Sequence, residues 1–147
     1  MEALKEFQRE LDLDPTNASA AYEAGEICRK LSQLDKAREY FEIAVNHYPD
    51  FEDGQIGLGR VLIALGKPQL ALSHLRKAIS LNPDNEVSYY QLALVYKASG
   101  DTAEQQKVLG EFRRVRAQRA RLEESLAAEV ASPREVTKQE LDFKDAP

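Results

Sequence analysis

Two histidines and one cysteine are the side chains of this sequence best suited to metal binding or nucleophilic chemistry. His47 stands directly before Tyr48-Pro49, and His74 stands among charged neighbours. Metal sites and catalytic triads need His, Cys, Asp or Glu partners at set spacings, and neither histidine has such a partner. Cys28 falls on an apolar stripe, where a cysteine is usually an inert core residue. We therefore expect no catalytic residue, no metal and no cofactor, so the chain is not predicted to be an enzyme.

Three glycines lie close together in the segment EDGQIGLGR, which is residues 52–60. A phosphate-binding loop would need a preceding strand and a following Lys-Ser/Thr pair, and the sequence has neither. Gly59 is expected to let two helices approach closely. For Gly54 and Gly57 we favour a locally soft helix over the close approach of a ligand backbone, because glycine destabilises a helix by about 1 kcal/mol relative to alanine.

Arginines crowd one stretch near the C-terminal end and raise the question of a nucleic-acid surface. The segment 101–131 nevertheless has as many acidic as basic residues, and the whole chain has a net charge of −5. Nucleic-acid binding normally relies on a basic patch that neutralises phosphates. A solvated helix face with internal ion pairs is the favoured interpretation, and we expect no nucleic-acid partner. The arginines are Arg113, Arg114, Arg116, Arg119 and Arg121.

Composition places the chain among globular proteins of one domain or a short array of repeats. It has 147 residues, of which 43% are hydrophobic and 31% charged, and its single cysteine excludes an internal disulfide. No apolar run of about 18 residues occurs, so no membrane span is predicted. The N-terminal residues lack a secretory signal pattern, which leaves the cytoplasm as the default compartment.

Apolar residues recur at helical spacing along most of the chain, so an all-α fold is expected. The spacing of Leu4, Phe7 and Leu11 marks the first helix, and a proline or a Ser-Gln, Gly-Lys or Gly-Asp pair follows each of the next segments. A residue before proline is pushed out of the helical region, which ends a helix there. The predicted helices are residues 2–13, 18–31, 34–48, 52–65, 69–81, 86–99 and 102–131.

The pattern repeats with a fixed period. Pro15, Pro49 and Pro83 stand 34 residues apart (15 to 49 and 49 to 83). Self-similarity at this length marks an array of helix pairs. Small and large residues recur with the same period, and small residues at helix contacts permit close packing. The aligned sets are Gly25, Gly59 and Ala93; Ala37 and Ala71; Phe41, Leu75 and Leu109; and Ala44 and Ala78.

The repeated segments Gly25…Ala37-x3-Phe41…Pro49 and Gly59…Ala71-x3-Leu75…Pro83 resemble the tetratricopeptide repeat. The resemblance extends over about residues 3–112. It implies a right-handed superhelix of stacked helix pairs. The sequence departs from the family pattern where large aromatics are usual, since Ala21 and Gln55 precede Tyr89 in one column. The domain is predicted to cover residues 1–131, with a half unit at 2–15, units at 18–49, 52–83 and 86–112, and a C-terminal helix to 131; residues 132–147 are predicted to be a flexible tail.

In this family the first helix of each pair lines a concave groove, which implies a scaffold that binds a peptide or helix of a partner protein. The apolar centre and charged rim of the surface fit this function. The resemblance also implies that chaperone C-termini are not bound, because Tyr22, Glu26, Gly57, Val87 and Gln91 stand where such binders have Lys, Asn and Arg. The groove residues by helical spacing are Tyr22, Glu26, Arg29, Asp53, Ile56, Arg60, Ile63, Val87, Tyr90, Leu94 and Lys97.

A second hypothesis is self-assembly through the long last helix. Its apolar residues follow a 4–3 alternation, interrupted by Arg119, which is typical of helices that pair. The early part of this helix should cover the last repeat, since terminal units of such arrays need a cap. In a variant of this hypothesis, Leu141 and Phe143 occupy the groove of another copy. The residues predicted to mediate self-association are Phe112, Val115, Leu122 and Leu126.

Overall fold

The computed structural model describes residues 2–131, and within this range all regular secondary structure is α-helical. The prediction of an all-α fold is therefore confirmed. Every helix begins and ends within one residue of its predicted position. The helices are α1 (Glu2–Leu13), α2 (Ala18–Lys30), α3 (Leu34–His47), α4 (Glu52–Ala64), α5 (Pro68–Leu81), α6 (Glu86–Ala98) and α7 (Thr102–Ala131).

Local sequence signals explain where the helices start and stop. The Asn17 side chain accepts a hydrogen bond from the Ala20 amide at 3.0 Å, so it caps α2 as expected. The turn after each of α2, α4 and α6 contains one residue with a left-handed backbone: Ser32 (φ 59°), Gly66 (φ 74°) and Gly100 (φ 73°). These three residues also recur with the 34-residue period, and glycine is the residue that adopts this conformation without steric cost.

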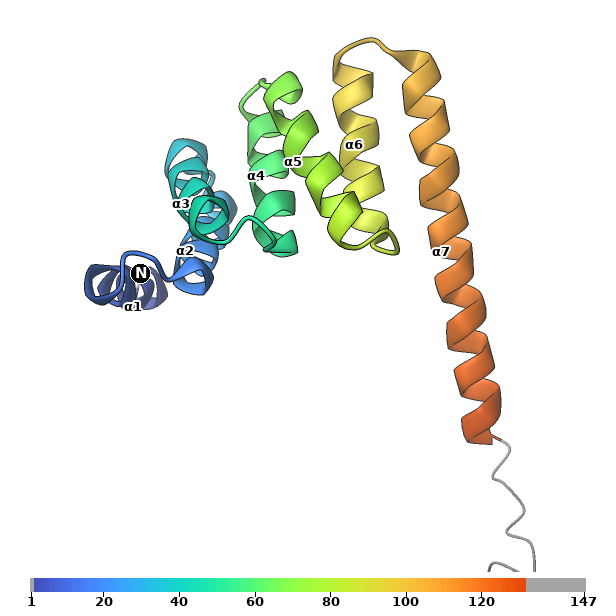
Figure 1. Ribbon diagram of the computed structural model, residues 1–147, viewed down its shortest axis with the longest axis horizontal. Coiled ribbons are helices and arrows are strands. Elements are labelled where there is room, and N and C mark those ends of the chain that lie inside the picture. The colour runs from blue at the N-terminus through green and yellow to red at the C-terminus, as the bar shows by residue number, and fades with distance from the viewer. Residues whose placement is uncertain (1, 132–147) are drawn as a thin grey trace, which may run out of the picture. The chain divides into compact units, whose positions relative to one another are not determined.

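The repeat region is built of two layers of helices. Each helix from α1 to α6 packs against the next one along the chain, as Figure 1 shows for the hairpins α2–α3 and α4–α5. In addition, α4 packs against both α2 and α6, so these three helices form one layer. Helices α1, α3 and α5 each pack against members of this layer. The layer of α2, α4 and α6 carries all the predicted groove residues.

The core follows the columns that the sequence repeats. Ala37, Phe41, Ala71, Leu75 and Ala78 have no exposed surface. Cys28 lies in the main apolar cluster, as its place on an apolar stripe predicts, and burial raises the pKa of its thiol.

Phe41 is held between the backbones of two glycines from different repeat units. A Cβ on Gly25 of α2 would lie 2.8 Å from the Phe41 ring, and one on Gly57 of α4 would lie 2.7 Å from it. Real Cβ atoms essentially never approach that closely, so both positions require glycine while the ring stays in place. The prediction of a soft helix is therefore wrong for Gly57. Its lack of a side chain makes room for the ring.

The same column has a smaller residue in the second unit. A Cβ on Gly59 would lie 2.7 Å from Leu75, which confirms the packing explanation for this glycine. Phe41 and Leu75 align, and the position that aligns with Gly57 is Gln91. The large residue of this column, Phe41, is thus accompanied by Gly57 in the following unit. The smaller Leu75 is accompanied by Gln91, which has a long side chain, at the matching position.

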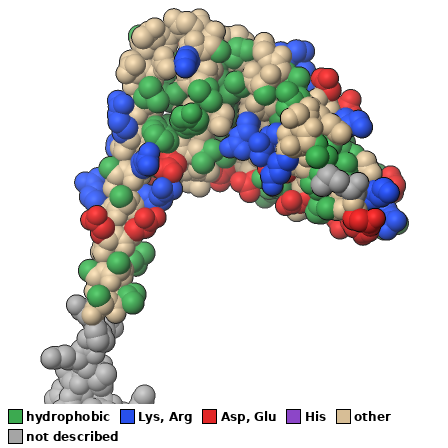
Figure 2. Space-filling view, turned by 180° about the vertical axis from the view of Figure 1, so that it is seen from behind, with side chains coloured by type: hydrophobic (Ala, Val, Ile, Leu, Met, Phe, Trp, Pro, Cys, Tyr) green, Lys and Arg blue, Asp and Glu red, His purple; other side chains and the backbone are tan. Residues whose placement is uncertain are grey.

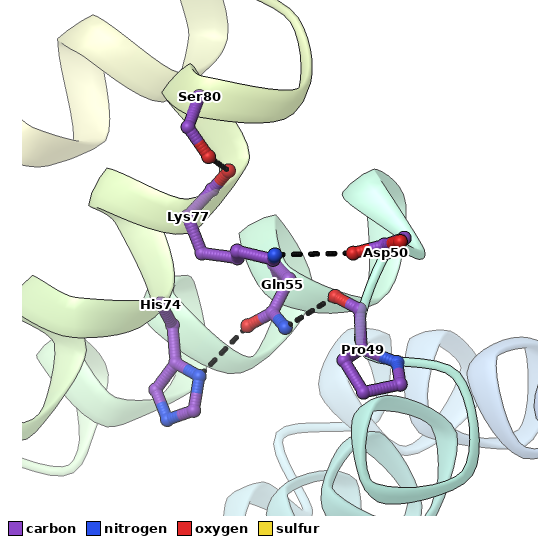
Figure 3. Close-up of polar contacts among 6 residues, drawn as sticks. All are labelled: Pro49, Asp50, Gln55, His74, Lys77 and Ser80. Atoms are coloured by element: carbon purple, nitrogen blue, oxygen red, sulfur yellow. Dashed lines mark hydrogen bonds and ion pairs between the residues drawn. The ribbon is translucent and has the colours of Figure 1, made fainter.

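A buried polar contact joins the second unit to the turn before it (Figure 3). Gln55 Nε2 donates to the Pro49 carbonyl at 2.8 Å, and Gln55 Oε1 lies 2.8 Å from His74 Nδ1. A carbonyl only accepts, so the amide oxygen faces His74 and Nδ1 must carry the proton. Tyr89, which aligns with Gln55, donates from its hydroxyl to the Pro83 carbonyl at 2.8 Å. Both side chains satisfy a carbonyl in the turn that follows the preceding helix.

His74 makes the stability of this contact depend on pH. Burial lowers its pKa from 6.5, and the charge of Glu42 opposes this effect. The unfolded chain therefore binds more protons than the folded chain between the two pKa values, so stability should fall as pH is lowered from about 7 through the folded pKa. Urea unfolding of wild type and His74→Gln between pH 5 and 7.5 should show the variant gaining relative to wild type at low pH. An unchanged difference would contradict this.

Ser88 in α6 has a hydroxyl without a hydrogen-bond partner, although the residue has no exposed surface. The aligned positions hold Ala20 and Gly54, so a hydroxyl is not needed at this place in the repeat. An unsatisfied buried polar group costs about 1–3 kcal/mol. Ser88→Ala should therefore raise the free energy of unfolding by about 1 kcal/mol in urea titrations followed by circular dichroism. A loss of stability would mean that the hydroxyl has a partner in solution.

Helix α7 crosses the boundary between two compact parts of the chain, Met1–Val115, which holds the repeats, and Arg116–Pro147. In the first part, Val115 is 3% exposed, and the rings of Phe112 and Tyr90 lie 5.8 Å apart. The start of the 30-residue α7 thus packs with the repeats. In the second part, residues 116–131 are all exposed. The predicted flexible tail, residues 132–147, lies outside the described residues.

Candidate partner-binding groove

Helices α2, α4 and the start of α6 enclose a hollow of about 140 Å³. We call this site the α2–α4–α6 hollow. It combines two acids, one exposed and one half-buried, with one half-buried base, an asparagine and several less polar residues. Six of the eleven predicted groove residues line it. The complete lining is Tyr22, Glu26, Asp53, Ile56, Gly57, Arg60, Asn85 and Val87.

Aromatic rings support the α2 side of the hollow. The Tyr22 ring lies 5.8 Å from the Phe41 ring and 5.3 Å from the Phe51 ring, with an edge-on geometry toward Phe51. Pairs at these distances are typical of stabilising aromatic contacts. The Phe41 ring that requires Gly57 is therefore also one of the rings that position Tyr22.

The Tyr22 phenol is neutral, and its surroundings in the hollow raise its pKa further. Burial raises its pKa to about 12, with further increases from the charges of Glu26, Asp53 and Glu23 and a decrease from Arg60. The hydroxyl therefore stays protonated at physiological pH and can donate a hydrogen bond.

The charged residues of the hollow differ in how they are held. Glu26 accepts two hydrogen bonds from Arg29, from Nε at 3.1 Å and from Nη2 at 3.0 Å. This two-point geometry fixes both side chains. Among the described residues, Asp53 and Arg60 have no such ion-pair partner within the repeat unit. One carboxylate and one guanidinium thus remain available to a ligand.

The other predicted groove residues lie outside the hollow. Arg29 forms an ion pair with the lining residue Glu26, and Ile63 packs against the core. Tyr90 is 46% exposed but lies against Phe112, and Leu94 is half-buried. Lys97 is exposed near the end of α6.

Ile56 is predicted to lie at the apolar centre of the groove, exposed to a partner, but its side chain is mostly buried. It is only 7% exposed, so it forms part of the wall and offers little surface to a partner. Figure 2 shows that hydrophobic side chains do gather on one face of the repeat region, with Lys and Arg side chains beside them.

Sequence reasoning did not place Asn85 in the site. Asn85 Oδ1 accepts from the Val87 amide at 3.0 Å, and Nδ2 donates to Glu52 at 2.7 Å. In the sequence an asparagine before a helix indicates an N-cap, which Asn85 is. Its second role depends on the packing of α6 against α4, and no local pattern carries that information.

A larger hollow of about 430 Å³ lies between α1 and α3. Its lining includes Tyr40, whose hydroxyl accepts from Gln8 Nε2 at 3.1 Å, and Pro15. Tyr40 also belongs to a repeat column, in which the side chain becomes smaller along the array, whereas it becomes larger in a second column. The first column is Tyr40, His74 and Val108, and the second is Ala21, Gln55 and Tyr89. The remaining lining residues are Gln8, Leu11, Asp12 and Ile43.

Two family models match the chain in separate segments. A tetratricopeptide repeat model matches residues 1–50, and a TPR repeat model matches residues 59–100. The first segment spans α1 to α3, the second runs from within α4 to the end of α6, and both contain residues of the 34-residue columns described above. The chain belongs to the tetratricopeptide repeat family. The resemblance inferred from its columns is confirmed.

Two known proteins share part of the sequence. The chain is 28% identical over 99 residues to the TPR repeat-containing protein MJ1428 of Methanocaldococcus jannaschii, covering 67% of this chain and 17% of that protein. It is 34% identical over 65 residues to mouse Protein O-mannosyl-transferase TMTC3, covering 44% of this chain and 7% of that protein. The chain thus spans a small part of both relatives.

Solved structures confirm the superhelical fold. MamA superposes with a TM-score of 0.76 at 22% identity, covering 80% of this chain and 69% of MamA. YrrB superposes with a TM-score of 0.70 at 27% identity, covering 76% of this chain and 58% of YrrB. YrrB is described as a TPR protein with an unusual peptide-binding site. Family and fold support a protein-interaction scaffold.

The described residues contain neither a candidate metal-ion cluster nor a candidate membrane span. In residues 2–131 no group of three or more His, Cys, Asp or Glu side chains is placed to hold a metal ion. None of the helices in the same range has the length and apolar character needed to cross a bilayer.

Proposed function

We propose that this tetratricopeptide repeat protein is a non-enzymatic scaffold that binds a peptide segment of a partner protein across α2, α4 and α6. One side chain of the peptide enters the α2–α4–α6 hollow. The observation that carries the proposal is the hollow itself, because three helices from successive units contribute to it. Concave sites that combine apolar walls with a few polar groups are typical binding sites.

The chemistry of the hollow supports a polar, charge-matched contact. Asp53 offers a carboxylate to a donor on the peptide, and Arg60 offers a guanidinium to a carbonyl or carboxylate. Tyr22 adds a neutral hydroxyl beside them. The peptide-binding site reported for YrrB, a protein with the same fold, supports a peptide as the class of ligand.

Selection from a random peptide display library tests this proposal and does not require the natural partner to be identified. The affinity of enriched peptides would be measured by fluorescence polarisation for wild type, for Arg60→Glu and for the matched control Lys36→Glu. The control makes the same charge change at an exposed residue of α3. Loss of a central charged contact typically weakens binding about tenfold or more. We expect that loss for Arg60→Glu and affinity within about twofold of wild type for Lys36→Glu. Failure to enrich any peptide, or equal losses in both variants, would overturn the proposal.

A second candidate function is self-association through the end of α7. Leu122, Leu126 and Val130 are 60%, 53% and 85% exposed. Phe112 and Val115, also predicted for this surface, instead pack within the repeat unit. Light scattering of the full chain should show a mass above that of the monomer at high concentration. The double variant Leu122→Ser, Leu126→Ser should return it to the monomer mass, whereas a monomeric wild type would exclude this function.

A further inference from the structure

The exposed part of α7 has a symmetric arrangement of residues on one face. Leu122 and Leu126 lie four positions apart, which places them side by side on the helix. Arg119 stands three positions before Leu122, and Glu129 stands three positions after Leu126. Residues at these spacings share one stripe of an α-helix. Along the stripe the order is basic, apolar, apolar and acidic, and it is centred on position 124.

We propose that a second copy of this chain covers the stripe in antiparallel orientation, with the two-fold axis at the level of position 124, halfway between Leu122 and Leu126. Leu122 of each copy then packs against Leu126 of the other copy. Arg119 of each copy faces Glu129 of the other, so the interface carries two ion pairs related by symmetry. The inference rests on the self-association proposed above and adds its direction and register.

Charge decides between the two possible directions of pairing. In a parallel, in-register pair, Arg119 would face Arg119 and Glu129 would face Glu129. Like charges at facing positions destabilise such a pair, whereas opposite charges favour it and set its orientation. Only the antiparallel register centred at position 124 aligns both leucines with leucines and both charges with their opposites.

The existing contact of Arg119 does not prevent this pairing. Arg119 Nε lies 3.6 Å from Glu123 Oε1 on the same helix, and these side chains are 55% and 69% exposed. Ion pairs that are this exposed contribute little to stability, so the guanidinium can turn toward a partner helix. Glu123 stands one position after Leu122, at the flank of the stripe, where it can stay near Arg119 in the pair.

The interface is small, which sets the conditions of the test. Two leucines per helix bury less surface than a standard interface, so association is expected to be weak and to require protein concentrations of about 100 µM. The full-length chain would be examined by sedimentation equilibrium up to about 500 µM in low-salt buffer, where screening is weakest.

Charge-reversal variants provide the decisive measurement. Arg119→Glu and Glu129→Arg should each lower the association constant at least tenfold, since each variant creates two like-charge contacts. The double variant should restore association to within about threefold of wild type, because it exchanges the members of each ion pair. Arg121→Glu lies off the stripe and changes the net charge as Arg119→Glu does, so it should leave association within about twofold of wild type.

The outcomes separate the register from self-association itself. If Leu122→Ser, Leu126→Ser abolishes association but the charge-reversal variants have no effect, the chain self-associates and the antiparallel register is overturned. Failure of the double charge reversal to restore association also overturns it. A chain that stays monomeric up to about 500 µM overturns both.

Discussion

Phe41→Ala should lower the free energy of unfolding by about 3–5 kcal/mol, the usual range for truncating a fully buried aromatic side chain. Phe41 has no exposed surface, and its ring fills the space between α2 and α4 that Gly25 and Gly57 leave open. Neither glycine has a side chain that could move into the cavity. Urea unfolding followed by circular dichroism at 222 nm would measure the change.

Leu70→Ala is the matched control for this truncation. Leu70 lies in α5 and is 51% exposed, so its removal leaves no enclosed cavity. We expect a change of at most about 1 kcal/mol, in line with other surface substitutions. If the two variants were equally stable, Phe41 would not have the structural role that its position indicates.

Gly57→Ala should destabilise the protein by about 1–3 kcal/mol, although alanine is the better helix former by about 1 kcal/mol. The added methyl group would lie 2.7 Å from Phe41 Cε1. Gly25 borders the same ring atoms, since a Cβ there would lie 2.8 Å from Phe41 Cε1, so the ring has little room to shift. The measurement is again the free energy of unfolding in urea.

Two controls separate steric conflict from helix propensity. Gly110 lies in α7, and a methyl group added there would meet no atom within 4 Å, so Gly110→Ala should stabilise the chain by up to about 1 kcal/mol. In a Phe41→Leu background, Gly57→Ala should lose most of its cost, since the smaller side chain is the one that the second unit has at this position. A cost that persists with leucine would refute the steric explanation.

The contacts within each helix pair could be predicted because their residues recur. Gly25 and Gly59 align, as do Phe41 and Leu75, and the structure brings each small residue against the large one of its own unit. The contact of Phe41 with Gly57 could not be predicted this way. The positions that align with Gly57 hold Glu23 and Gln91, so no column marks it. A contact between successive units that occurs once leaves no periodic signal.

The candidate site was only partly predictable for a related reason. Helical spacing identified which face of α2 and α4 carries Tyr22, Asp53 and Arg60, because that face is opposite the packing stripe. It could not give the depth of each side chain. Ile56 is buried because α4 has neighbours in its own layer on both sides. Val115 is buried where the start of α7 packs within the Met1–Val115 part of the chain, and no turn residue in the sequence marks where that packing ends.

The position of Phe41 couples the unfolding of neighbouring repeats. The Phe41 ring is carried by α3 and packs on both α2 and α4, so it becomes hydrated when either helix moves away. Unfolding of either of the first two repeats alone would therefore lose the stabilisation that comes from burying this ring. In arrays of this kind, nearest-neighbour coupling determines whether a stack melts as one block or repeat by repeat. Amide hydrogens of α2, α3 and α4 should accordingly share one exchange free energy.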